Sequence, residues 1–149
     1  MTSTVLLCSD GSELALSALS RGLPLLAPAD RTVVATVVDV VHPMDVVGTG
    51  MAGGVLSPAD AERLDAQQSE AGRRALDATC ERLGLTDAET VILGGSPGPA
   101  LCDLATSLPA TVVVVGTRGM GGLRRAVLGS VSDHVVRNAP CPVLVCSAE

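Results

Sequence analysis

The chain has 149 residues, of which 47% are hydrophobic, a formal net charge of −6, and no Phe, Tyr or Trp. This length predicts a single domain with one core, and the acidic balance and missing aromatic rings disfavour DNA and RNA as partners. The cationic side chains are all arginine, which excludes a Walker-type phosphate loop and a Schiff-base mechanism because both need a lysine.

Five apolar segments rich in β-branched residues are predicted as strands. They are continuous apolar runs rather than alternating ones, which is typical of strands buried on both faces of a parallel sheet. The segments are residues 4–9, 32–40, 90–93, 111–116 and 142–146.

Helical signals separate these segments. A short helix is expected after the Asp-Gly of residues 10–11, until Pro24 removes an amide donor. The longest helix is predicted from the N-cap Ser57 and the following Pro58 to Gly84, where it stops. Two further helices are expected over residues 96–108 and 130–138.

The resulting β-α-β-α-β-α-β-α-β order predicts an α/β fold, a doubly wound parallel sheet with right-handed crossovers. Ligands bind such sheets beyond the carboxyl ends of the strands, where the strand order reverses. The order 3-2-1-4-5 would bring the polar turns after the first and fourth strands into one crevice, whereas a flavodoxin-like order 2-1-3-4-5 would separate them. We favour the first order. Residues 41–56 are expected to be a lid, a binding loop or a disordered segment.

The stretch GTRGMGGLRRAVLGSVSDHV, residues 116–135, has two readings. Its glycines could only punctuate a turn, and Ser130 as N-cap could start a helix that needs no ligand. Alternatively, the free amides of Ser130, Val131 and Ser132 at a helix N-terminus form an anion site, for which phosphate is the natural guest.

Other polar residues also have two interpretations. Asp10 could cap the first helix or take part in the site. Arg118, Arg124 and Arg125 fit a solvated basic face better than phosphate contacts. His42 and His134 are taken as structural or surface residues, and nothing marks Cys141 as a nucleophile.

The apolar runs and the cysteines of the chain also indicate its cellular compartment. It contains no apolar run long enough to span a bilayer and no export signal, so we expect a cytoplasmic protein. The scattered cysteines, without a Cys-x-x-Cys pair, suggest neither a disulfide framework nor a zinc site.

Three motifs resemble the universal stress protein family. Gly116, Gly119, Gly129 and Ser130 form a G-x2-G-x9-G-S pattern that is similar to its ATP-binding signature. VLLCSDGSELALSAL resembles the family's opening strand, turn and first helix, and APCPVLVC resembles its closing strand. Cys8, Ser9, Pro24 and Thr111 depart from the common pattern, and the departure leaves the contact of Ser9 open.

The resemblance implies a five-stranded sheet with helices on both faces, in the order 3-2-1-4-5, that binds ATP or a related adenine nucleotide. It also implies a homodimer formed through residues 142–146. Carried over by position, the nucleotide-binding residues would be Ser9, Asp10, Gly11, Val37, Val115, Gly116, Arg118, Gly119, Gly129, Ser130, Val131 and Ser132.

Asp10 is the nearest carboxylate for a Mg²⁺ ion on the phosphates, which it would reach through water. We therefore expect a nucleotide-binding regulatory module of the stress response, with no catalytic residue. Two alternatives stay open. One is a slow ATPase or phosphotransferase, although no lysine is available for phosphoryl transfer. The other is a dimeric interaction protein that binds no nucleotide.

Overall fold

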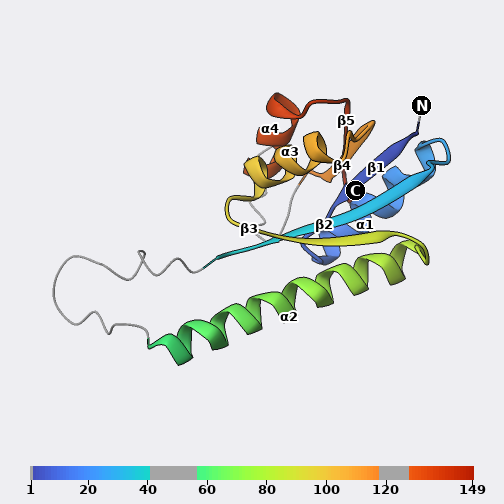
Figure 1. Cartoon of the computed structure of the whole chain (residues 1–149). Helices are drawn as coiled ribbons and strands as arrows, with labels where there is room; N and C mark the ends of the chain where they lie inside the picture. Colours follow the sequence, from blue (N-terminus) through green and yellow to red (C-terminus); the bar gives the residue numbers. More distant parts are fainter. Residues whose placement is uncertain (1, 41–56, 118–127) are drawn as a thin grey trace.

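The computed structural model describes residues 2–40, 57–117 and 128–149. Their centre is a parallel sheet in the order β3-β2-β1-β4-β5 (Figure 1). This confirms the predicted order 3-2-1-4-5 and rules out the flavodoxin-like one. The strands are β1 Thr4–Cys8, β2 Arg31–Val38, β3 Glu89–Gly94, β4 Val112–Gly116 and β5 Val143–Cys146.

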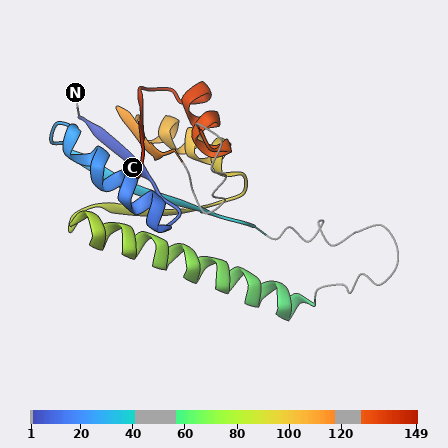
Figure 2. The same cartoon turned by 180° about the vertical axis from the view of Figure 1, so that it is seen from behind.

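Helices cover both faces of the sheet, as predicted. Those before and after β2 pack on one face, and those before and after β4 pack on the other (Figures 1 and 2). On the first face lie α1 Glu13–Gly22, the short 3₁₀ helix η1 Leu23–Leu25 and α2 Pro58–Leu83, and on the second lie α3 Pro97–Ser107 and α4 Ser130–Asn138. None of the helices in these described ranges is both long enough and apolar enough to cross a bilayer.

The core has two layers because the side chains of each strand alternate between the faces. In β1, Val5 and Leu7 belong to the layer under α1 and α2, and Leu6 and Cys8 belong to the layer under α3 and α4. All residues of β1 are buried. A central strand of a sheet covered on both faces is expected to look like this.

The edge strands differ from this prediction. In β3, Thr90 is exposed and Ile92 keeps 38% of its surface accessible, and three of the four residues of β5 are only half-buried. The expectation that all five strands are buried on both faces is therefore wrong for β3 and β5. Among the described residues, each of them has a neighbouring strand on one side only, so solvent reaches residues that a central strand would cover.

Local capping chemistry sets the ends of α2. Ser57 Oγ accepts a hydrogen bond from the amide of Asp60 at 3.2 Å and donates one to Asp60 Oδ2 at 2.7 Å. Gly84 ends the helix with a left-handed φ of 65°. Both ends match the prediction, because the Ser-Pro start and the glycine stop act within one turn of the helix.

The start of α4 corrects one detail. Its N-cap is Gly129, in extended conformation with φ −74° and ψ 164°, and Ser130 is the first helical residue rather than the cap. The reason is a pair of backbone bonds: the Gly129 amide donates to Thr117 O at 2.7 Å, and the Asp133 amide donates to Gly129 O at 2.9 Å.

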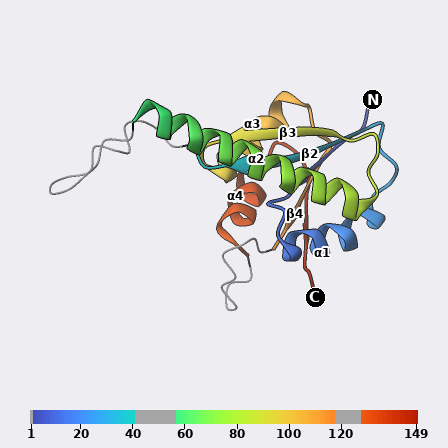
Figure 3. The same cartoon turned by 90° about the horizontal axis from the view of Figure 1, so that it is seen from below.

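Helix α2 is longer than the sheet face that it covers. Its buried residues are Gly72, Leu76 and Thr79, all in its second half, and its first half runs out past the sheet (Figure 3). At Gly72 the helix lies so close to β2 that an added Cβ would stand 3.0 Å from Val38 Cγ1. The second half of α2 therefore lies tightly on the sheet, beside the β1–α1 turn.

Candidate functional site

The candidate site lies at the carboxyl ends of β1, the central strand, and its neighbour β4. β1 and β4 pair in parallel, with Leu7 opposite Val114, so their carboxyl ends lie together at one edge of the sheet. The chain leaves β1 toward one face through α1 and leaves β4 toward the other face through α4. This is the point at which the strand order reverses, where open α/β sheets bind their ligands.

The turn after β1 is held by its own hydrogen bonds. The amide of Ser9 donates to Ala35 O at 3.0 Å, and the amide of Gly11 donates to Ser9 Oγ at 3.1 Å. Asp10 Oδ1 accepts from the amide of Ser12 at 2.9 Å, as in an Asx turn. Ser12, not Asp10, is the N-cap of α1. Asp10 therefore braces the turn and stays at its exposed tip.

The start of α4 is open by contrast. The first three amides of the helix, those of Ser130, Val131 and Ser132, have no intrahelical acceptor, and within the described parts of the chain no other acceptor bonds them. The Ser132 hydroxyl donates to Gly129 O at 3.0 Å, so Ser132 offers a ligand its amide. Three free amides at the positive end of a helix dipole favour an anion.

Two predicted residues belong to the core layer beside this point. Val115 is 3% exposed and Val37 is half-buried, and both pack in the layer under α3 and α4. Val115 therefore offers a ligand only its main chain, while Val37 lies near the carboxyl end of β2. Gly116 ends β4 opposite Cys146.

Several predicted features lie outside the described residues. These are Arg118 and Gly119 of the signature, Arg124 and Arg125, His42, and the loop 41–56.

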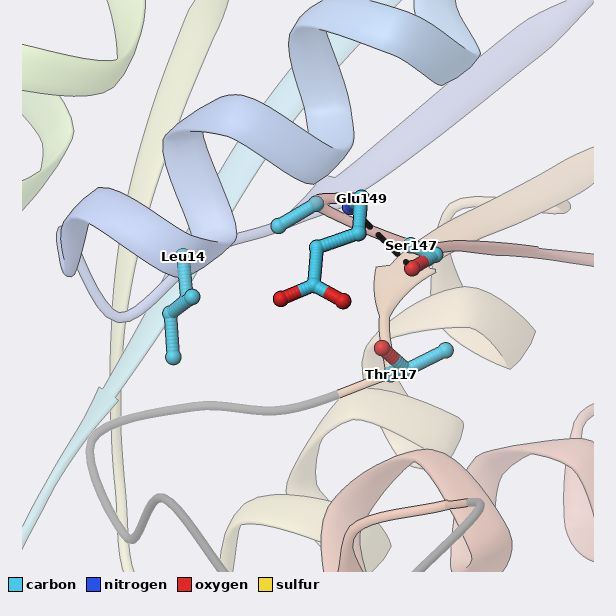
Figure 4. Close-up of a pocket in the computed structure, with 5 residues that line it drawn as sticks. Leu14, Thr117, Ser147 and Glu149 are labelled. Atoms are coloured by element: carbon cyan, nitrogen blue, oxygen red, sulfur yellow. Dashed lines mark hydrogen bonds between the residues drawn. The ribbon is translucent and has the colours of Figure 1, made fainter. Parts of the chain in front are cut away.

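A small pocket lies next to the strand ends, on the α1 side (Figure 4). It is lined by Leu14, Thr117, Ser147, Ala148 and Glu149. The carboxylate of Glu149 points into it, between Leu14 and Thr117. This negative charge makes the pocket a poor place for a phosphate, whereas the amides of α4 lie beyond Thr117, whose carbonyl accepts from Gly129. The sequence contained no signal that would place Glu149 here.

The environments of Cys8 and Cys141 disfavour reactive thiols. All five cysteines are free. Burial raises the pKa of Cys8 strongly, and the neighbouring Cys102 and Cys141 add to this shift. Burial also raises the pKa of Cys141, which is half-buried, so a reactive thiolate is disfavoured at both positions.

The other candidate ligands do not form a cluster. The imidazole of His134 lies against α3, where an added Cβ on Gly98 would stand 2.6 Å from its Cγ. In the ranges that the structure covers, no group of three or more His, Cys, Asp or Glu side chains could hold a metal ion. An ion at this site would need oxygen atoms from its ligand.

Sequence reasoning missed the contribution of α2. The hydroxyl oxygens of Thr79 and Ser9 lie 2.8 Å apart in the interior, although the two residues are separated by 70 positions. A contact between segments so distant leaves no local pattern. Only the packing of α2 beside α1 reveals it.

Comparison with known proteins shows the family and agrees with the fold. Residues 1–147 match the model of the universal stress protein family. A universal stress protein from Thermus aquaticus is 32% identical over 148 residues, 97% of this chain and 98% of its own. The protein UspA from Lactobacillus plantarum has a similar structure, with a TM-score of 0.72 at 24% identity over 97% of both chains.

A third relative is a universal stress protein in complex with cAMP. It is 28% identical, covers 99% of this chain and 98% of its own, and has a TM-score of 0.58. The chain therefore belongs to the universal stress protein family.

Proposed function

We propose that this protein binds an adenine nucleotide at the carboxyl ends of β1 and β4 and acts as a regulatory module of the stress response. The observation that carries the proposal is the row of amides at Ser130, Val131 and Ser132 that no residue of the described ranges bonds, next to the carboxyl ends of β1 and β4. Charge-assisted bonds from such amides are among the stronger hydrogen bonds that a protein can offer a phosphate. A relative that is 28% identical forms a complex with cAMP, which supports the same ligand class.

The proposed pose places the phosphates at α4 and the base toward β2. No aromatic ring exists to stack on adenine, so aliphatic side chains such as Val37 would contact its faces. Backbone groups near Val115 and Gly116 would follow the ribose and phosphates, with Arg118 and Gly119 continuing this path as the family signature implies.

Asp10 fits a role with Mg²⁺. It is an exposed carboxylate at the tip of the β1–α1 turn, and no second carboxylate joins it in a metal cluster among residues 2–40, 57–117 and 128–149. Mg²⁺ keeps much of its water and binds phosphate oxygens readily. The ion would therefore be held by the nucleotide and by Asp10 through water, and would neutralise their negative charges. We expect at most slow hydrolysis, because the chain has no lysine for the transferred phosphoryl group.

The binding test uses adenosine, AMP and ATP in parallel calorimetric titrations of the nucleotide-free protein. Phosphate recognition predicts that AMP and ATP bind at least tenfold more tightly than adenosine. The chain has no Trp or Tyr, so an adenine absorption band that survives gel filtration would also report a bound nucleotide directly. Equal affinity for adenosine and AMP would contradict the proposed phosphate site.

A single substitution tests the amides themselves. Ser130→Pro removes one amide donor at the first helical position, where proline is tolerated and where α2 and α3 already carry Pro58 and Pro97. Gly129 has the extended conformation that a residue before proline prefers. We expect AMP to bind about tenfold more weakly to Ser130→Pro. Ser130→Ala, which keeps the amide, is the control and should lose much less.

We further infer that the protein dimerises through β5. This strand lies at the end of the sheet and pairs with β4, and in the described parts of the chain no strand pairs with its other edge. An open strand edge can pair with a second copy. Sedimentation velocity should then give twice the 14.9 kDa of one chain. A monomer at micromolar concentration would contradict this inference.

A further inference from the structure

One face of α2 contacts the β1–α1 turn at three successive points. Residues spaced by four and three positions lie along the same side of a helix. The contacts join Ala75 to Gly11, Thr79 to Ser9 and Arg82 to Glu13. We call the three α2 residues the α2 stripe.

The centre of the contact is a buried pair of hydroxyls. Thr79 is fully buried and Ser9 is 7% exposed. Thr79 Oγ1 lies 2.7 Å from Ala75 O and 2.8 Å from Ser9 Oγ, and Ser9 Oγ accepts from the amide of Gly11. Each hydroxyl has one proton. If Thr79 donates to Ala75 O, then Ser9 donates to Thr79, and the bonds run unbroken from the turn to the backbone of α2.

The flanking contacts restrict the turn further. Gly11 has a φ of 75°, and a Cβ there would stand 2.7 Å from both Cα and Cβ of Ala75, so the turn lies directly on the helix backbone. One turn farther along α2, Arg82 forms an ion pair with Glu13 in the first turn of α1. The stripe thus holds both the turn and the helix that follows it.

Asp10 lies between these anchored residues. The amides of Ser9, Gly11 and Ser12 already donate within the protein, so they are not available to a phosphate. The charged group of the turn is the Asp10 carboxylate, and its position is what the turn sets for a nucleotide that carries Mg²⁺. A residue that holds the turn acts on the ligand through that carboxylate.

We propose that the α2 stripe is a positioning element of the nucleotide site, which fixes Asp10 for the metal-bearing phosphates by holding Ser9, Gly11 and Glu13. This inference rests on the proposed nucleotide binding. It assigns to Thr79 and Arg82 a role that depends on the phosphates and on Mg²⁺, not on the base. Neither residue belongs to the glycine signature.

The experiment measures binding of adenosine, of ATP, and of ATP with Mg²⁺ to wild type and Thr79→Val. The variant keeps the β-branched shape and loses the hydroxyl. We expect ATP with Mg²⁺ to bind about fivefold more weakly, the size of one lost hydrogen bond, while adenosine affinity stays within twofold. Thr79→Ser restores the hydroxyl and should restore the affinity.

Two matched variants separate positioning from general damage. Thr106→Val removes a threonine hydroxyl that bonds the carbonyl of Cys102 four residues earlier in α3, far from the turn, and should leave binding unchanged. Arg82→Gln should weaken the binding of ATP with Mg²⁺ about twofold. Arg73→Gln breaks ion pairs with Glu70 and Asp77, which both lie on α2 itself, and should leave this binding unchanged. The comparison of Arg82→Gln with Arg73→Gln also tests the proposal if Thr79→Val does not fold.

A readout in the nucleotide-free protein tests the contact itself. Hydrogen exchange at the Gly11 amide, which bonds to Ser9 Oγ, should become faster in Thr79→Val and return to the wild-type rate in Thr79→Ser. Unchanged exchange would overturn the hydroxyl chain.

The binding outcomes distinguish this inference from the proposed function. If wild type binds ATP and Thr79→Val and Arg82→Gln bind it equally well, the positioning role is wrong and nucleotide binding stands. An equal loss for adenosine and for ATP with Mg²⁺ also overturns it, because the damage would then not depend on the phosphates. If wild type binds neither AMP nor ATP, both inferences fail together.

Discussion

The turn that follows β1 and the start of α4 that follows β4 differ in how their backbone amides are bonded. After β1, the amides of Ser9, Gly11 and Ser12 donate within the protein, and the turn lies against α2. After β4, α4 begins with three amides that no described residue bonds. The contrast teaches that one side of the site fixes the geometry while the other supplies the binding donors. Changes on the first side should therefore affect folding and, through Asp10, the binding of a nucleotide that carries Mg²⁺, whereas changes on the second should affect phosphate binding with little effect on folding.

The largest effect is expected on the closed side. Gly11→Ala combines the strain of a positive φ with a clash against Ala75, and we expect it to reduce the free energy of unfolding by about 3 kcal/mol. Gly84→Ala is the matched control, since Gly84 has a similar φ of 65° but open space around it. It should cost about 1 kcal/mol. Urea unfolding measures both, and equal losses would show that contact with α2 does not matter.

A slightly smaller effect is expected on the open side, and only with ligand. AMP at about 100 times its Kd should stabilise wild type by about 2.7 kcal/mol, because it binds only the folded state. At the same AMP concentration, Ser130→Pro should gain about half of this, while its stability without ligand stays close to that of wild type. Thermal unfolding with and without AMP provides the measurement. A large loss of stability in ligand-free Ser130→Pro would break the proposed division.

Alkaline pH should weaken the core layer under α3 and α4, to which Cys8 at the end of β1 belongs. Burial raises the folded-state pKa of Cys8, at the end of β1, above its ordinary value of 9.0. The stability that the neutral thiol contributes is therefore complete below about pH 9 and is lost as the pH rises from there toward the folded-state value. The loss is about 1.4 kcal/mol per pH unit for each such thiol.

Cys8→Ala tests this assignment. Its urea midpoint should fall less steeply than that of wild type between pH 8.5 and 10, the range in which the unfolded thiol ionises. Cys80→Ala removes a more accessible thiol, whose pKa burial also raises, and should change the slope less. Parallel curves for Cys8→Ala and wild type would refute the role of Cys8.

The smallest effect is expected far from both segments. Arg31 and Glu89 form a two-point ion pair with distances of 2.7 Å at the amino ends of β2 and β3, and their side chains are 36% and 54% exposed. Exposed pairs contribute little to stability. Arg31→Gln should leave nucleotide affinity unchanged and shift the urea midpoint least of these variants, with the shift fading at high salt. A loss of AMP affinity here would mean that the site extends beyond the strand ends.

Local signals explain which parts of the fold could be predicted. The ends of α2 follow from Ser57, Pro58 and Gly84, which act within one helical turn. The buried runs of β1 and β4 are read directly from continuous apolar residues. The burial of β3 and β5 was misjudged, because an apolar segment of the same composition can occupy an edge, and only the strand order determines which strands lie there.

In the candidate site, too, features with a local sequence signal could be predicted and contacts between distant segments could not. The Gly-Ser step at residues 129–130 predicted the α4 amides that no described residue bonds, although the cap itself is Gly129. The contacts of Thr79 and Arg82 with the turn could not be predicted, since they join residues about 70 positions apart. Glu149 was likewise unforeseen, because its place beside Leu14 depends on where β5 ends in space.

The overhang of α2 also has a consequence for the order in which the helix loses structure. Before Gly72, roughly 20 Å of helix has no buried residue and depends on its Ser57 cap and on surface pairs such as Glu70 with Arg73. This half should fray on its own at little cost in free energy. Melting from that end must stop at Gly72 and Leu76, where the helix enters the core. The residues of the α2 stripe that hold the turn therefore stay helical while the first half of α2 frays.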